Sequence, residues 1–107
     1  MELQNYINNN LDNYVSEFKN RVDKYKMQSK NFFIQNKKRF NFIYVDGSHF
    51  YDDVLNDAQS AFKILNEGAY MLFDDYNWNF HKNGKNPINA INLFLKQNKE
   101  KIKIIYI

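Results

Sequence analysis

Residues 40–46 read Phe-Asn-Phe-Ile-Tyr-Val-Asp, and residues 69–75 read Ala-Tyr-Met-Leu-Phe-Asp-Asp. Each stretch is a short run rich in β-branched and aromatic residues that stops at an acidic residue, which is typical of a buried parallel strand. Between the two runs lies an apolar stripe with helical spacing, formed by Val54, Leu55, Ala58, Ala61, Phe62 and Leu65. We therefore expect a helix over residues 50–67, ended by Gly68, between two neighbouring parallel strands.

Further helices and strands are expected on either side of this unit. The spacing of apolar residues predicts a helix over residues 2–20 and a short one over residues 29–36, with Ser29 as its cap. Asn86-Pro87 begins another helix, because proline is favoured at the first helical position. Residues 23–28 and 101–107 predict short strands. This order predicts an α/β fold with a mainly parallel sheet and flanking helices.

The composition is that of a single small domain spanning residues 1–107. Hydrophobic residues make up 44% of the chain, which is too many for a disordered protein. Cysteine is absent, which excludes disulfides and cysteine-ligated zinc. The net charge of +3 comes from scattered lysines, so no nucleic-acid partner is expected. Neither a signal peptide nor a bilayer-spanning run is evident, so we expect a cytoplasmic protein without a membrane partner.

Three acidic residues and a histidine are expected to meet at one edge of the sheet. Asp46 and His49 follow the first strand, and Asp74 and Asp75 follow the second. Neighbouring parallel strands end at the same edge, which is where open α/β sheets bind ligands. Three carboxylates suit a divalent cation, and an imidazole beside them can serve as a general base. The alternative interpretation is that Asp46 and Asp74 only cap the turns that follow their strands.

The loop after the acidic pair is rich in aromatic residues. Residues 76–85 include Trp78, Phe80 and His81. Loops at this edge of a sheet often carry specificity, so these side chains either line a pocket for the substrate or form a lid that packs on the sheet. We expect His81 to be an exposed loop residue.

Several linked motifs resemble one enzyme family. They are Phe42-Ile-Tyr-Val-Asp-Gly-Ser-His49, Tyr51-Asp-Asp-Val-Leu-Asn-Asp57, Leu65-Asn-Glu-Gly68 and Leu72-Phe-Asp-Asp-Tyr76. In this order they resemble the C-terminal half of class I S-adenosylmethionine-dependent methyltransferases, in particular the macrocin O-methyltransferase-like branch. The resemblance covers residues 40–95 and reaches back to Tyr25. It implies a partial Rossmann-like methyltransferase sheet.

The resemblance also implies a site and its ligands. In metal-dependent relatives, the residues that correspond to Asp46, Asp74 and Asp75 hold Mg²⁺, which lowers the pKa of a hydroxyl on a small-molecule acceptor. The residue that corresponds to His49 is the implied proton acceptor. Ser29 and Asp46 correspond to positions beside the S-adenosylmethionine cofactor.

The main departure from the family is the missing glycine-rich loop. The chain has only Gly47, Gly68 and Gly84, which are far apart in sequence. We therefore expect a truncated methyltransferase-like domain that lacks the cofactor-binding half and is inactive alone. It would form a rearranged compact sheet, a homodimer, or a complex with a complementing N-terminal chain. The alternatives are a degenerate remnant that serves as an interaction module, and a simple divalent-cation-binding domain.

Overall fold

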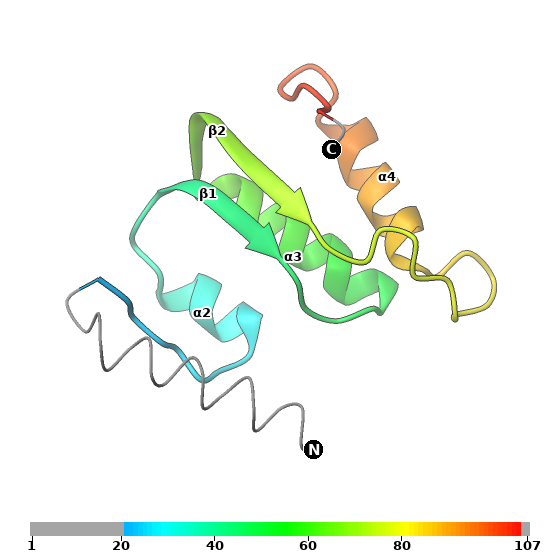
Figure 1. Ribbon diagram of the computed structural model, residues 1–107, viewed down its shortest axis with the longest axis horizontal. Coiled ribbons are helices and arrows are strands. Elements are labelled where there is room, and N and C mark those ends of the chain that lie inside the picture. The colour runs from blue at the N-terminus through cyan, green and yellow to red at the C-terminus, as the bar shows by residue number, and fades with distance from the viewer. Residues whose placement is uncertain (1–20, 106–107) are drawn as a thin grey trace.

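Two parallel strands packed on helices form the centre of the structure. The computed structural model describes residues 21–105, and the helix predicted over residues 2–20 lies outside them. The elements in chain order are α2 (Ser29–Gln35), β1 (Phe40–Val45), α3 (Tyr51–Lys63), β2 (Leu65–Phe73) and α4 (Pro87–Gln97). In Figure 1, α3 lies behind the two strands. The α/β fold and the pairing of two parallel neighbours are confirmed.

The predicted end of the central helix is wrong. α3 ends at Lys63, and β2 begins almost at once with Leu65. The Arg39 guanidinium donates hydrogen bonds to the carbonyl oxygens of Lys63 (3.2 Å) and Leu65 (2.8 Å). The bond to Lys63 satisfies a carbonyl that the end of the helix leaves without an intrahelical partner, and the bond to Leu65 holds the first residue of β2.

Gly68 lies inside β2 rather than at the end of the helix. The register pairs Phe40 with Leu65 but Phe42 with Tyr70, so β2 carries a bulge between these pairs. Gly68 has φ +76°, a left-handed conformation that glycine adopts without the steric cost of a Cβ atom. Gly68 therefore allows the strand to bulge, and glycine is often found at the left-handed position of a β-bulge.

The hydrophobic core lies between α3 and α4. Its buried apolar residues are Val54, Ala58, Ala61, Ala90, Ile91 and Phe94. The Phe94 ring makes edge-to-face contacts with Phe62 and with Phe73 of β2, at centroid distances of 5.5 and 5.9 Å. α4 begins as predicted, with Pro87 in its first turn and a reciprocal capping box between Asn86 and Asn89.

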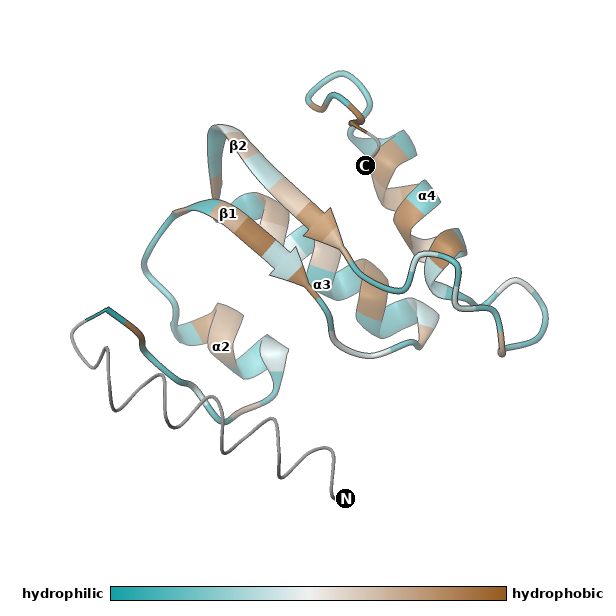
Figure 2. Ribbon diagram, viewed as in Figure 1, coloured by the Kyte–Doolittle hydropathy of each residue, from teal (hydrophilic) through white to brown (hydrophobic). Residues whose placement is uncertain are grey.

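One face of the sheet is uncovered within residues 21–105. Phe42 pairs with Tyr70 and Tyr44 pairs with Leu72, and these four side chains are 37–61% exposed. Side chains two residues apart on a strand share a face, so they form one apolar surface, and apolar residues are visible on both strands in Figure 2. We call these four residues the open sheet face.

Two predicted strands are absent, and one predicted cap is wrong. Residues 23–28 are irregular, and so are residues 102–105, while residues 106–107 lie outside the described part. Neither segment has a neighbouring strand among residues 21–105, and an isolated strand leaves its backbone groups unpaired. The helix predicted at 29–36 is present as α2, but Gln28 occupies the N-cap position. The Ser29 hydroxyl donates instead to Asp57 Oδ1 at 2.6 Å.

No helix among residues 21–105 has both the length and the apolar character needed to cross a bilayer.

Candidate functional site

The three predicted aspartates lie together at the carboxyl ends of the strands. Val45 pairs with Phe73, and the Asp74 amide donates to the Val45 carbonyl at 3.0 Å, so the ladder extends just past the strand ends. One carboxylate oxygen from each of Asp46, Asp74 and Asp75 lies within 4.8 Å of the other two, and all three residues are exposed. The convergence expected from the strand order is therefore present, whereas the ligand role of these carboxylates stays a prediction.

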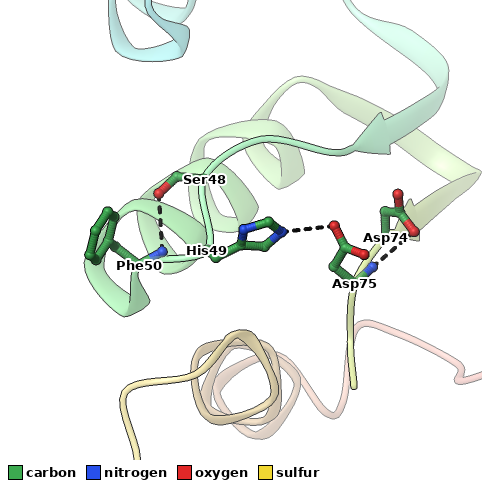
Figure 3. A network of polar contacts seen from close by, with 5 residues as sticks. All are labelled: Ser48, His49, Phe50, Asp74 and Asp75. Atoms are coloured by element: carbon green, nitrogen blue, oxygen red, sulfur yellow. Dashed lines mark hydrogen bonds and ion pairs between the residues drawn. The ribbon is translucent and has the colours of Figure 1, made fainter. Parts of the chain in front are cut away.

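His49 joins this cluster through Asp75. The His49 Nε2 atom lies 2.8 Å from Asp75 Oδ2, as Figure 3 shows. A carboxylate only accepts hydrogen bonds, so Nε2 carries the proton in the neutral ring and Nδ1 carries the lone pair. The two side chains are 35% and 42% exposed, which leaves the pair accessible to a ligand.

Asp75 is held in an unusual backbone conformation. Its φ is +56°, and aspartate is one of the few residues other than glycine that adopts this left-handed region readily. The Asp75 amide donates to Asp74 Oδ1 at 2.9 Å (Figure 3). The turn therefore holds the Asp74 carboxylate by the backbone while the Asp75 carboxylate binds His49. Strained residues of this kind concentrate at functional sites.

The aspartates have different protonation preferences. Partial desolvation, followed by the charge of Asp74, raises the pKa of the Asp46 carboxyl. A hydrogen bond from the Tyr44 hydroxyl, followed by the one from the Asp75 amide, lowers the pKa of Asp74. The same hydrogen bond, followed by partial desolvation, raises the pKa of the Tyr44 hydroxyl. Asp74 is thus the anion that the site stabilises, and Asp46 takes up a proton more readily.

The turn between β1 and α3 is held by Ser48. Its hydroxyl accepts a hydrogen bond from the Phe50 amide at 3.0 Å (Figure 3) and donates to Asp53 Oδ2 at 2.8 Å. These bonds connect the turn to the N-cap residue Phe50 and to the first turn of α3, which begins at Tyr51, one residue after the predicted start. His49 therefore projects from a short turn fixed at both sides.

Ser29 is connected to the site through Asp57. The shallow depression at the strand ends is lined by Asp46, His49, Asp57 and Asp74, among others, whereas Ser29 is not part of its lining. The Ser29 hydroxyl donates a hydrogen bond to Asp57 Oδ1. The other oxygen, Oδ2, lies close to Gly47, since a Cβ atom added to this glycine would be 3.3 Å from it. Burial raises the pKa of Asp57, and the Ser29 hydrogen bond opposes this shift.

Sequence reasoning missed the contributions of Asp57 and Tyr44. The signal for Tyr44 was available, since it precedes Asp46 by two residues on a strand and such residues share a face. Asp57 had a weaker signal, as an acidic residue beside the apolar stripe that α3 buries. Helical spacing alone does not tell such a residue from an ordinary exposed acid.

The aromatic loop packs against His49. The Trp78 indole stacks on the His49 ring with a centroid distance of 4.4 Å and an interplanar angle of 6°. His81 also contacts Trp78, at 4.6 Å, and stacks on Phe50 at 4.8 Å. The expectation that His81 is exposed is wrong, because this packing half-buries it and shields Nε2. Phe80 remains 80% exposed.

Comparison with known proteins places these residues in a family. A family model described as a methyltransferase domain matches residues 2–76. The chain belongs to this methyltransferase domain family. The match includes all of the acidic cluster and His49, while Trp78 and α4 lie beyond it. The methyltransferase assignment expected from the motifs is thereby confirmed.

Other similarities are limited in extent. An uncharacterized protein of Acanthamoeba polyphaga mimivirus is 44% identical over 34 residues, which is 32% of this chain and 15% of the viral protein. The chain therefore corresponds to only a small part of that relative's length. No solved structure matches the chain significantly.

Proposed function

We propose that this methyltransferase domain is the catalytic portion of an S-adenosylmethionine-dependent, metal-assisted O-methyltransferase of the macrocin O-methyltransferase-like branch. The observation that carries the proposal is the meeting of Asp46, Asp74 and Asp75 within 4.8 Å, beside a His49–Asp75 hydrogen bond. A small molecule with a hydroxyl group would be the methyl acceptor. The family match supports methyl transfer in general.

The acidic cluster fits a divalent cation. Oxygen atoms on opposite sides of one ion are separated by about twice the bond length, or roughly 4–5 Å for Mg²⁺ and Ca²⁺. The three carboxylate oxygens all lie within 4.8 Å of one another, so they are close enough together to face one ion. Asp46, Asp74 and Asp75 would hold the ion, and a bound ion would favour ionisation of the acceptor hydroxyl.

His49 is suited to accept the proton of the acceptor. Asp75 fixes the proton on Nε2, so the lone pair of Nδ1 is free to receive another. As the acceptor oxygen bonds to the methyl carbon and the sulfur–methyl bond breaks, His49 takes up the hydroxyl proton at Nδ1. The Asp75 carboxylate then stabilises the imidazolium, as the aspartate of a catalytic triad does.

Cofactor binding needs residues beyond those that form this site. Ser29 and Asp46 are the proposed cofactor contacts within the chain, but Ser29 is already bonded to Asp57. The chain has no pair of nearby glycines to approach a cofactor closely. We infer that the glycine-rich segment comes from a complementing chain or from further residues of a longer protein. The open sheet face offers the apolar surface that such a segment would cover.

Methyl transfer in a complemented preparation tests the proposal. The chain would be mixed with a candidate segment that carries a glycine-rich strand-turn-helix, and transfer of the labelled methyl group from S-adenosylmethionine would be measured. We expect Asp74→Ala to lower the rate more than the roughly 10- to 100-fold that follows loss of a residue supporting a metal ligand. Asp52→Ala is the matched control, because Asp52 lies in the first turn of α3 outside the cluster. Full activity of Asp74→Ala would contradict the metal-assisted mechanism.

A second candidate function is an interaction module without activity. It is favoured by the open sheet face, where Phe42 and Tyr70 are 58% and 61% exposed. Apolar surface of this kind on a small domain marks a binding site. This alternative predicts complex formation with the complementing segment but no methyl transfer in any preparation.

A further inference from the structure

Trp78 stacks on His49 and fixes the plane of the imidazole ring more firmly than the hydrogen bond to Asp75 does alone. The His49 ring is attached through Cβ, and a hydrogen bond at Nε2 restrains its rotation about the Cβ–Cγ bond only while this solvent-accessible pair stays bonded. A nearly parallel contact with an indole, at 4.4 Å and 6°, fixes the plane of the ring. The two contacts together determine the direction in which Nδ1 points.

The loop that carries Trp78 is itself held at several points. The Trp78 amide donates to the Asp75 carbonyl at 3.0 Å, which forms a turn directly after the acidic pair. The Tyr76 hydroxyl donates to Asn92 Oδ1 of α4 at 2.7 Å. At the far end, the His81 amide donates to Asn86 Oδ1 (2.9 Å), and Asn86 Nδ2 donates to the His81 carbonyl (3.1 Å). The indole is therefore supported by α4 as well as by the strand end.

Two neighbouring rings contact the indole. Phe80 contacts Trp78 edge to face at 5.2 Å, and His81 contacts it at 4.6 Å with a tilt of 58°. No ring contact between Phe80 and His49 is present among the described residues. Phe80 thus touches the indole without touching the histidine, which makes it a matched control.

We propose that Trp78 is a positioning residue, which holds the His49 ring in the plane that keeps Nδ1 directed at the acceptor. The inference rests on the proposed function of His49 as the proton acceptor. It gives the aromatic loop a role distinct from a lid or a pocket wall, since the indole acts through His49 and need not touch the acceptor. The loop after the second strand then contributes to the chemistry from outside the family match.

The orientation of His49 in the full chain tests this proposal without any activity assay. Three-bond couplings about the His49 side chain, measured by nuclear magnetic resonance at one fixed pH, report whether the ring keeps a single rotamer. The chain has only two histidines, so comparison with His81→Gln assigns the signals. The variants are Trp78→Leu, which removes the ring, Trp78→Phe, which keeps a ring face, and Phe80→Leu as the control. Circular dichroism verifies that each variant folds.

We expect a single His49 rotamer in the unmodified chain and in Phe80→Leu. In Trp78→Leu the ratio of the stacked rotamer to the others should fall about two- to tenfold, the factor that corresponds to an ordinary aromatic pair. Trp78→Phe should keep most of the stacked rotamer, because it retains a ring face. The proposal is overturned if Trp78→Leu keeps the single rotamer. It is also overturned if Phe80→Leu lowers the ratio of the stacked rotamer to the others as much as Trp78→Leu does. In the complemented preparation, Trp78→Leu should lower kcat while leaving KM unchanged, and a change confined to KM would contradict the positioning role.

The two proposals fail in different ways. If no preparation transfers methyl groups, the proposed function fails, while the rotamer measurement still decides whether Trp78 orients His49. If methyl transfer occurs and the rotamer does not depend on Trp78, only the positioning role is lost.

Discussion

Asp75 carries two interactions that a single carboxylate rarely combines. One of its oxygens binds His49 Nε2, and its carboxylate also supplies an oxygen to the acidic cluster. A carboxylate has two oxygens and about four lone-pair positions, so it can orient the imidazole and face a cation together. The left-handed backbone at Asp75 places this carboxylate where it can bind His49 and also face Asp46 and Asp74. At the scale of single residues, this aspartate links the proposed base to the proposed metal site.

A divalent cation should stabilise the folded chain. A ligand that binds only the folded state at about tenfold above its Kd adds roughly 1.4 kcal/mol, which corresponds to a rise in Tm of about 5 °C for a domain of this size. We expect this rise with Mg²⁺ or Mn²⁺, its loss in Asp74→Asn, and its retention in Asp52→Asn, as measured by thermal melting. An equal rise in all three proteins would show that the cation binds elsewhere.

Replacing Asp46 should stabilise the chain at neutral pH. Its pKa is raised in the folded state by desolvation and by the charge of Asp74, so folding favours its protonated form and stability is lost as pH rises through the folded pKa. Asp46→Asn removes this penalty, and for an exposed group we expect a gain of at most about 0.5 kcal/mol, or about 2–4 °C in Tm. The gain should vanish in acid, where Asp46 is protonated in any case. A gain that persists at low pH would point to a different cause.

Two connections determine how the elements assemble. The bulge at Gly68 lets β2 begin at Leu65 and still bring Phe73 opposite Val45, so that Asp74 comes directly beside the end of β1. Arg39, which precedes β1, binds the backbone at the end of α3 and thereby joins all three elements. The position of the acidic cluster thus depends on a glycine and an arginine that are not part of it.

The left-handed backbone at Gly68 should make this position sensitive to substitution. A Cβ atom there would have no heavy atom within 4 Å, so substitution by alanine costs only the left-handed backbone strain at φ +76°. We expect Gly68→Ala to lower the free energy of unfolding in urea by about 1–2 kcal/mol. Gly68→Asn should lose less, because asparagine tolerates this region better. If both variants lost the same amount, the strain would not be the cause.

The described residues leave the open sheet face uncovered. The described sheet has two strands, while its helical core lies on α3 and α4. The open sheet face lies next to the edge that carries the acidic cluster, because Tyr44 and Leu72, which pair with each other, precede Asp46 and Asp74 by two residues. A segment that covers the face would therefore also border the site.

We expect the isolated chain to bind S-adenosylmethionine weakly. The 107 residues supply two proposed cofactor contacts and no glycine-rich loop, so most of the usual binding energy is missing. Isothermal titration calorimetry should detect no micromolar affinity for the chain alone, and affinity should appear when the complementing segment is added. Micromolar binding by the chain alone would contradict this account and would direct attention to Ser29 and Asp57.

The sequence by itself determined the parts of the fold that depend on local pattern. The apolar runs of residues 40–45 and 69–73, the stripe along α3 and the proline at the start of α4 each indicated their element, because strand and helix periodicities are properties of adjacent residues. The sequence also placed three aspartates and His49 at one edge, since the ends of neighbouring parallel strands coincide.

Only the tertiary structure decided what depends on distant contacts. The strands predicted at 23–28 and 101–107 had suitable residues but no neighbour to pair with, as far as the described residues show. Ser29 binds Asp57 across 28 positions of sequence, and Trp78 stacks on His49 across a loop that no periodicity describes. Strand pairing and ring stacking each depend on two segments that meet only when the chain folds. The sequence of one segment alone therefore does not determine them.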